Sequence, residues 1–177
     1  PKEITPESVQ EVNILCDHLT YWYGVGYEPD TPDKAVMQLQ YVAAVMLLRG
    51  EQTPSMYKEE SLYDSQIRSF MKKVNVEVDP EIDALGPIKR YMAKVEVKTK
   101  DGKSYKTLKE YPYGHTMNPA THEDINRKFK RLATGKGWNG EPLLTSEKAE
   151  KTIDLVDGLE NLENVKSLIK LLAIYRV

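Results

Sequence analysis

Apolar and polar positions change their period several times along the chain, and each period predicts a type of element. Residues 9–16 and 74–78 carry apolar side chains at alternating or nearly alternating positions and predict two strands. Residues 93–99 alternate charged side chains with valine, and Asp101-Gly102 predicts a tight turn into a further strand over residues 104–108. The sequence therefore predicts four short strands, the last two joined as a hairpin.

Between the first two strands the period is that of helices. Thr31 is a suitable N-cap, Pro32 suits the first helical position and Gly50 suits the C-terminal end, which predicts one helix over residues 31–49. The centre of this helix is apolar on nearly every face, so we expect it to be buried on more than one side. A second helix is predicted over residues 61–73.

The remaining segments complete the predicted order of elements. Residues 21–27 are rich in glycine and aromatic residues and are interpreted as a loop. After a cap at Thr121, helices are expected to about Leu132, over about residues 146–158 and over about residues 161–174. This order predicts an α+β class: a small domain with an antiparallel sheet and helices over residues 1–120, then a C-terminal helical segment over residues 121–177.

Composition and charge exclude several classes of function. The formal net charge is -2, and lysines are interleaved with acidic residues, which argues against a nucleic-acid-binding surface. No apolar run approaches the roughly 20 residues needed to cross a bilayer, and the first residues lack the pattern of a secretion signal. We therefore expect a cytoplasmic protein with no membrane partner. Cys16 is the only cysteine and the three histidines lie far apart, so no metal site is expected.

Four segments, in order, resemble the second half of the MmgE/PrpD family, which includes 2-methylcitrate dehydratase. The first is residues 4–12, with the sequence ITPESVQEV, and the second is residues 33–50, which contain QYVAAVMLLRG. The third follows the Asp101-Gly102 hairpin as YGHTMNPATHEDI over residues 113–125, and the last is LENLENV over residues 159–165. Together they cover nearly all of the chain, and their order and spacing carry the resemblance.

The resemblance implies a fold, an activity and a partner. Family members combine a large all-α domain with a small α+β lid, and the active site lies between the two. They include dehydratases, a decarboxylase and an epimerase of polycarboxylic acids, and need no metal or organic cofactor. Nothing in this chain matches the helical first half, on which residues from about 121 onward would pack. We therefore expect a second polypeptide that carries this half, in a hetero-oligomer; cleavage of a single gene product is the alternative.

Tyr41 and His115 are the two candidate catalytic residues. By resemblance, Tyr41 falls on an active-site tyrosine of the decarboxylase branch, where a phenol can hydrogen-bond a substrate carboxylate or donate a proton. The alternative is a core tyrosine whose hydroxyl is satisfied by the backbone. His115 has a side chain that titrates near neutral pH, which suits acid–base catalysis. Its alternative role is to cap a loop.

The resulting functional hypothesis is a cofactor-independent hydro-lyase of the 2-methylcitrate dehydratase type. The chain would be its C-terminal half or small subunit, active only with a partner, and its substrate a polycarboxylic hydroxy acid. Two other interpretations stay open at the level of sequence. The chain could be a non-catalytic binding or regulatory module with the family's lid fold, or it could belong to a family epimerase or decarboxylase.

Overall fold

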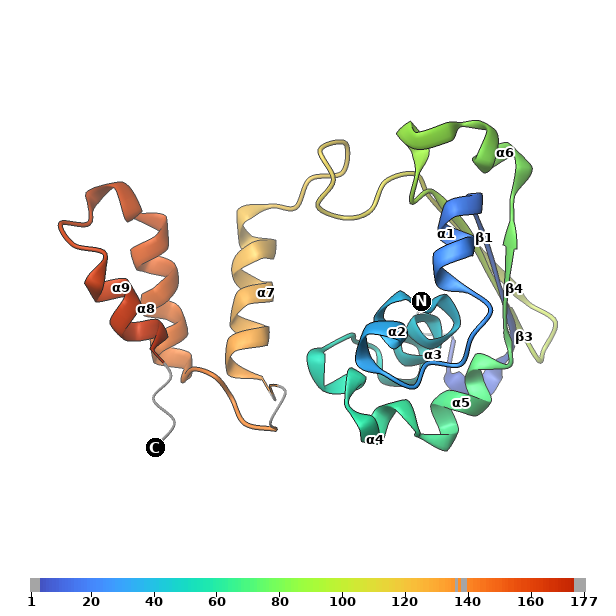
Figure 1. Cartoon of the computed structure of the whole chain (residues 1–177), viewed down its shortest axis with the longest axis horizontal. Helices are drawn as coiled ribbons and strands as arrows, with labels where there is room; N and C mark the ends of the chain where they lie inside the picture. Colours follow the sequence, from blue (N-terminus) through green and yellow to red (C-terminus); the bar gives the residue numbers. More distant parts are fainter. Residues whose placement is uncertain (1–3, 136, 138–139, 174–177) are drawn as a thin grey trace. The chain divides into compact units, whose positions relative to one another are not determined.

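A computed structural model of the chain describes residues 4–135, 137 and 140–173 (Figure 1). These residues form two compact units. Unit 1 comprises residues 4–52 and 56–119, and unit 2 comprises residues 53–55 and 120–173 as far as they are described. No helix of this described part is long and apolar enough to cross a membrane.

Unit 1 is built on one four-stranded sheet with the strand order β2-β1-β3-β4. The strands are β1 (Val9–Cys16), β2 (Val74–Val78), β3 (Ala93–Thr99) and β4 (Ser104–Lys109). The predicted α+β class and the β3–β4 hairpin are confirmed. The sheet is mixed, however, and not purely antiparallel, because β1 pairs with β2 in parallel. The reason is the long helical crossover between them, which returns the chain in the same direction.

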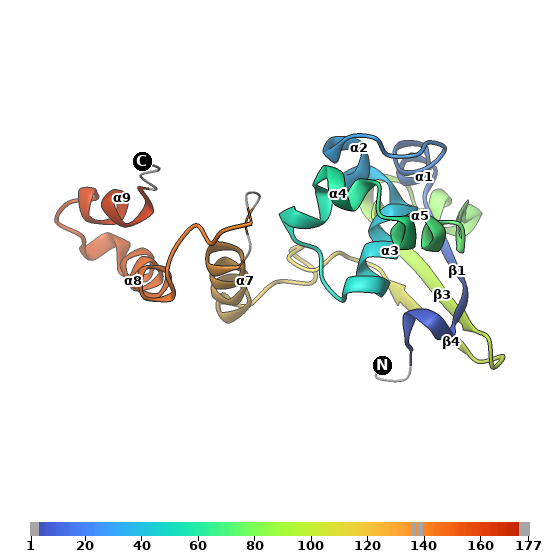
Figure 2. The ribbon, with the colours of Figure 1, turned by 90° about the horizontal axis from the view of Figure 1, so that it is seen from below.

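Helices cover one face of this sheet. The helices of unit 1 are α1 (His18–Gly24), α2 (Pro32–Met37), α3 (Leu39–Arg49), α4 (Glu59–Leu62), α5 (Ser65–Met71) and α6 (Pro80–Ala84). The short 3-10 turns η1 (Pro6–Ser8) and η3 (Gly86–Lys89) also belong to this unit, and a further 3-10 turn, η2 (Pro54–Tyr57), follows α3. Figure 2 shows α3 and α5 against the same side of the sheet. Their apolar side chains meet those of β1 and β2 in a core that includes Val12, Val45, Ile67 and Val74.

The predicted loop over residues 21–27 is wrong in its first half, which is helical. Helix α1 begins after Asp17, whose carboxylate accepts hydrogen bonds from the backbone N–H groups of Leu19 and Thr20 at 3.0 and 3.1 Å. This cap satisfies N–H groups that a helix start would otherwise leave without a partner. The aromatic residues 21–23 belong to this helix, and the signal for it is the capping aspartate before them, which the interpretation as a loop did not consider.

The predicted helix over residues 31–49 is two helices. Its ends are confirmed: the Thr31 hydroxyl caps α2, and Gly50 takes a left-handed conformation with φ 74° at the end of α3. The break lies at Gln38, whose ψ of 113° is extended and whose side-chain oxygen accepts the N–H of Tyr41 at 2.5 Å. A glutamine side chain thus starts α3 as its N-cap. The helix predicted over residues 61–73 also divides, into α4 and α5.

Unit 2 is helical. It contains α7 (His122–Thr134), α8 (Ser146–Asp157), the 3-10 turn η4 (Leu159–Asn161) and α9 (Lys166–Leu172). The cap at Thr121 is confirmed, with Asp124 completing a capping box. The last helix begins later than predicted, and its expected end at residue 174 lies outside the described residues. Several large apolar side chains of this unit are exposed, namely Ile125, Val156, Leu159, Val165 and Ile169.

Cys16 gives a direct probe of the fold of unit 1. Its side chain is buried, and this burial, with a smaller effect from the charge of Asp17, raises the pKa of the thiol to about 11. Only the thiolate reacts readily with alkylating agents. We expect iodoacetamide to modify Cys16 at pH 8 at least about 100-fold more slowly than a free thiol, and at the ordinary rate in urea. Rapid labelling without denaturant, followed by mass spectrometry, would contradict the packing of β1.

Candidate active site

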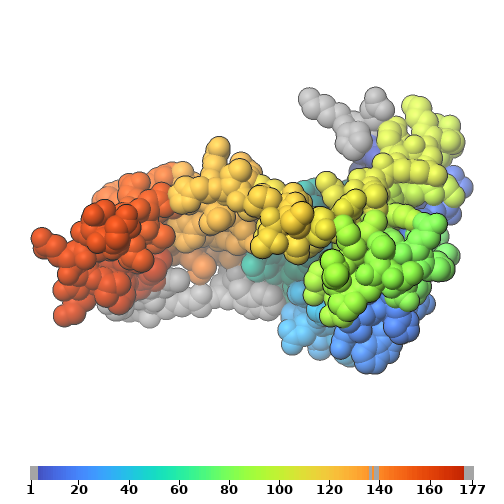
Figure 3. All heavy atoms as spheres, turned by 90° about the horizontal axis from the view of Figure 1, so that it is seen from above, coloured from blue at the N-terminus to red at the C-terminus, as the bar shows by residue number. Residues whose placement is uncertain are grey.

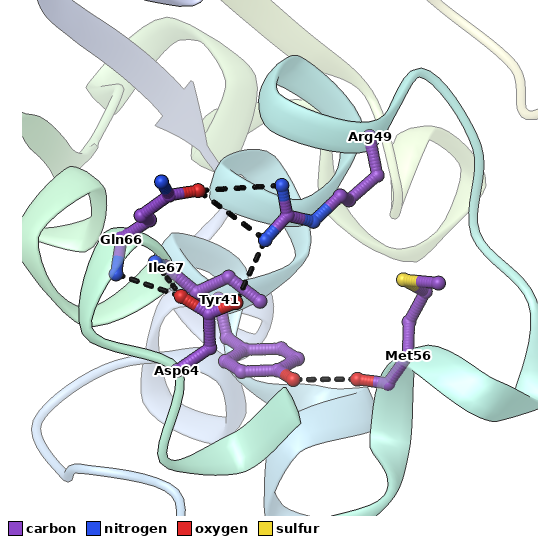
Figure 4. Close-up of polar contacts among 6 residues, drawn as sticks. All are labelled: Tyr41, Arg49, Met56, Asp64, Gln66 and Ile67. Carbon is purple, nitrogen blue, oxygen red and sulfur yellow. Dashed lines mark hydrogen bonds and ion pairs between the residues drawn. The ribbon is translucent and has the colours of Figure 1, made fainter. Parts of the chain in front are cut away.

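Tyr41 lies at the centre of the helical layer of unit 1. Its side chain is 0% exposed, and its hydroxyl donates a hydrogen bond of 2.5 Å to the backbone carbonyl of Met56 (Figure 4). The Tyr57 ring lies nearby, with 5.9 Å between the two ring centroids. This is the geometry of a core tyrosine satisfied by the backbone. For the phenol to meet a substrate, the contact with Met56 must open.

The surroundings of Tyr41 are held by capping and ion-pair contacts. Gln38 fixes the first turn of α3 through the Tyr41 N–H, as described above. At the other end of α3, Arg49 pairs with Asp64 at 2.7 Å and also reaches Gln66 (Figure 4). Asp64 in turn caps α5. These contacts tie α3 to α5 and leave the Arg49 guanidinium engaged with a protein carboxylate.

The protonation state of Tyr41 limits its chemistry. Burial raises the pKa of the phenol to about 12, with smaller contributions from Tyr57 and from the charge of Asp64. The hydroxyl therefore keeps its proton throughout the neutral range. A neutral phenol can donate a hydrogen bond or a proton to a developing negative charge, but it cannot act as the base that removes a proton.

His115 lies in the segment after β4, where its contacts are local. Its Nδ1 accepts the backbone N–H of Met117 at 3.1 Å, and its ring stacks on Tyr111 with 4.9 Å between centroids. A bridge to Asn118 closes the turn. These contacts describe a histidine that caps a loop. In the described part of the chain no hydrogen bond, ion pair or ring contact joins His115 to Tyr41, so the structure does not bring the two candidates together.

The described residues hold no group of three or more histidine, cysteine, aspartate or glutamate side chains able to bind a metal ion. His122 belongs to unit 2, where it contacts Asp157 at 3.0 Å.

A contact that the sequence did not indicate ties α1 to the start of β3. Asp17 accepts hydrogen bonds from the Thr20 hydroxyl, at 2.5 Å, and from the backbone N–H of Tyr91. Tyr91 has a φ of 77°, a left-handed conformation that residues with a side chain rarely adopt. Asp83 of α6 adds a second tie, because its carboxylate accepts the His18 N–H at 2.8 Å. In the sequence, the one sign of these contacts is an aspartate directly before a helical run, which indicates a helix cap but not the bond to Tyr91.

Unit 1 should lose stability as the pH falls below about 4. Burial alone would raise the pKa values of Asp17 and Asp64. The hydrogen bonds that each carboxylate accepts have a larger combined effect and hold both pKa values below the usual range. A carboxyl whose pKa is lower in the folded than in the unfolded chain stabilises the fold above its unfolded pKa, near 4, and loses this effect as pH falls through the folded pKa.

The measurement is the urea midpoint of unit 1 at pH 7, 5 and 3. It is followed by the reaction of Cys16 with 4,4′-dithiodipyridine, a disulfide reagent that modifies accessible thiols at acidic pH, where alkylation by iodoacetamide is too slow. We expect little change from pH 7 to 5 and a clear fall by pH 3. The variant Asp64→Asn should start lower and depend less on pH. A midpoint that is the same at pH 3 and pH 7 would show that these carboxylates carry no such linkage.

The surface of unit 1 has several hollows, of which two bear on function. The larger, about 750 Å³, lies on the sheet face opposite α3 and α5. Its charged side chains are mostly paired with one another, as in Lys98 with Glu11 at 2.7 Å and Lys106 with Glu96 at 3.3 Å. Such a face is typical of a sheet surface in contact with water. The smaller, about 480 Å³, lies beside α1 and α2.

Comparison with known proteins places this architecture in a family. The family model of the MmgE/PrpD C-terminal domain matches residues 2–161, and the chain belongs to the MmgE/PrpD family. Two relatives are cis-aconitate decarboxylases, one from Mus musculus and one from Homo sapiens. They are 29% and 31% identical over 106 residues, which is 60% of this chain. The chain spans about a fifth of the length of these curated relatives, 21% and 22% respectively.

Proposed function

We propose that this chain is the C-terminal half, or small subunit, of a lyase that acts on polycarboxylic acids and needs a partner chain for activity. The observation that carries the proposal is the family match over residues 2–161, on an α+β unit that holds Tyr41 in its central helix. The relatives are named as decarboxylases of a polycarboxylic acid, which supports a lyase-type reaction. The helical half is expected from a second polypeptide.

The first candidate reaction is dehydration of a hydroxy acid of the 2-methylcitrate type. A base removes a proton from the carbon beside a carboxylate, the carbon–oxygen bond breaks, and the hydroxyl leaves as water after taking a proton. Tyr41, neutral at pH 7, suits the donor to the leaving hydroxyl. Cations must also hold the substrate carboxylates. Arg49 and Lys34 are paired with Asp64 and Asp30, so the partner would supply these cations.

The second candidate reaction is decarboxylation, which the names of the relatives favour. Here a carbon–carbon bond breaks, CO2 leaves, and the electron pair that stays on carbon takes up a proton. Tyr41 would serve as the proton donor or as a hydrogen-bond donor to a carboxylate of the substrate. Epimerisation shares proton transfer beside a carboxylate and differs only in returning the proton to the opposite face.

The surface of unit 2 supports a partner. Large apolar side chains on its helices, such as Ile125 at 57% and Ile169 at 58% exposed, have no cover within their own unit. Exposed apolar side chains that gather on one surface mark interfaces in soluble proteins, and we propose that those of unit 2 do so. A helical chain that covers them would gain roughly 25 cal/mol for each Å² of apolar surface removed from water.

The test begins with purification from the native source and identification of co-purifying chains by mass spectrometry. The purified complex and the chain alone are then assayed with 2-methylcitrate for loss of water and with cis-aconitate for release of CO2. Turnover by the complex but not by the chain supports the proposal, and the substrate used separates the two reactions. Equal turnover by the chain alone would overturn the need for a partner. A partner without turnover would favour a binding or regulatory module.

A further inference from the structure

The smaller hollow of unit 1 has a mainly apolar lining. It lies between α1, α2 and the turn before β3, and its volume of about 480 Å³ is within the usual range for small-molecule sites. Apolar side chains from these three segments and from the first residue of α3 line it, namely Leu19, Tyr23, Val36, Met37, Leu39 and Tyr91. Gly24 allows the close approach of its wall, because a side chain there would come within 2.7 Å of Leu39. The wall of the hollow is therefore closely packed where Gly24 meets Leu39.

The backbone at its rim is held in an unusual conformation. Tyr91, at the rim, has the φ of 77° described above, and its N–H is bound by the buried carboxylate of Asp17. Asp83 fastens α6 to the same end of α1. In the space-filling view the green atoms of the α6 region lie against blue atoms of the N-terminal part of the chain (Figure 3). Strained residues that the surrounding structure holds in place often occur at binding sites.

Besides Thr20, whose hydroxyl already donates to Asp17, the polar side-chain groups of the lining are those of Arg90, Tyr23 and Tyr91. Arg90 is the only charged residue in the lining, and its guanidinium has no ion pair among the described residues. The phenol hydroxyls of Tyr23 and Tyr91 likewise have no hydrogen-bond partner in that part of the chain, although Tyr23 contacts the ring of Trp22. A guanidinium and a phenol both donate hydrogen bonds, and a carboxylate accepts several at once.

We propose that this hollow binds a small carboxylate with an aliphatic body. The carboxylate would lie against Arg90 and the tyrosine hydroxyls, and the aliphatic part against Met37 and Leu39. A single guanidinium matches a single negative charge, so a monocarboxylate fits this lining better than a tricarboxylate. The site is separate from the side chain of Tyr41, which is fully buried and has no place in the lining.

Methionine labelling can test the proposal directly on the full chain. The sequence holds six methionines, and a sample labelled with 13C at the methionine methyl groups should give one signal for each. The Met37 signal, assigned with Met37→Leu, should shift on titration with hexanoate. The signal of Met117, which is exposed after β4 and is not in the lining, should stay in place. Hexanamide, which lacks the charge, and propane-1,2,3-tricarboxylate should each bind at least about tenfold more weakly.

Variants at the rim separate the charge from the packing. Arg90→Gln should weaken hexanoate binding at least about tenfold, because a charge-assisted hydrogen bond is lost. Lys100→Gln, which also removes one exposed positive charge but lies outside the lining, should leave binding unchanged. Tyr91→Phe should weaken binding less than Arg90→Gln. The Cys16 labelling rate checks that each variant is folded.

Three results would overturn the proposal. Equal binding of hexanamide and hexanoate would show that the hollow recognises only apolar surface. Tighter binding of the tricarboxylate would assign a different class of ligand. A Met37 signal that moves only when the partner chain is added, and with none of these probes, would show that the hollow is a protein contact.

Discussion

Tyr41→Phe should lower kcat of the reconstituted complex by about 100-fold or more, the usual size of the effect when a proton donor is removed. The structural cost should be small. The variant loses one neutral hydrogen bond, from the hydroxyl to the Met56 carbonyl, which corresponds to about 1 kcal/mol of the free energy of unfolding. Activity and stability are therefore expected to change by very different amounts, and that difference is what separates a catalytic phenol from a core phenol.

Tyr27→Phe provides the matched control. The Tyr27 hydroxyl also donates to backbone carbonyls, those of Tyr23 at 3.1 Å and Lys34 at 3.3 Å, and neither of these hydrogen bonds involves Tyr41. We expect it to leave kcat unchanged and to alter stability by a similar amount. If Tyr41→Phe and Tyr27→Phe have the same small effect on kcat, Tyr41 is a structural residue. The hypothesis that it takes part in catalysis is then rejected. The pH profile adds a check, since a Tyr41 pKa of about 12 predicts no loss of the donor below about pH 10.

Ile67→Ala should lower the free energy of unfolding of unit 1 by about 3 kcal/mol. Ile67 is 1% exposed and lies on α5 in the core that α3 and α5 form against the sheet. Truncation removes buried methyl and methylene groups and leaves a cavity that a well-packed core fills only in part. Urea unfolding followed by Cys16 labelling measures the effect within unit 1. A change below about 1 kcal/mol would show that this core is loosely packed.

Ile125→Ala makes the same chemical change on the exposed surface of unit 2. In the isolated chain it should change stability by less than about 0.5 kcal/mol, because the side chain is 57% exposed. In the complex it should weaken association with the partner, since the proposed interface covers this helix face. A variant that leaves association unchanged would place the partner elsewhere.

For the candidate site, the sequence predicted which residues to consider but not the contacts that surround them. It placed Tyr41 on a helix buried on several sides, and the structure shows a side chain with no exposure. It did not indicate that Met56 would accept the hydroxyl, since that contact depends on how the chain folds back after Gly50. It also did not indicate the tie between Asp17 and Tyr91, two residues far apart in the sequence. Whether Tyr41 and His115 act in catalysis stays a prediction.

The sequence by itself determined the elements whose causes are local. The Asp101-Gly102 turn, the Thr31 and Thr121 caps and the Gly50 end each depend on a few neighbouring residues. Its motifs also determined the family, which the match over residues 2–161 confirms. Only the tertiary structure decided the parallel pairing of β1 with β2. It likewise decided the burial of the Tyr41 hydroxyl. These two features arise from contacts between separate segments, whose free energy no single stretch of sequence contains. The break at Gln38 has a local cause, the side-chain cap on Tyr41, but the pattern of apolar positions did not reveal it.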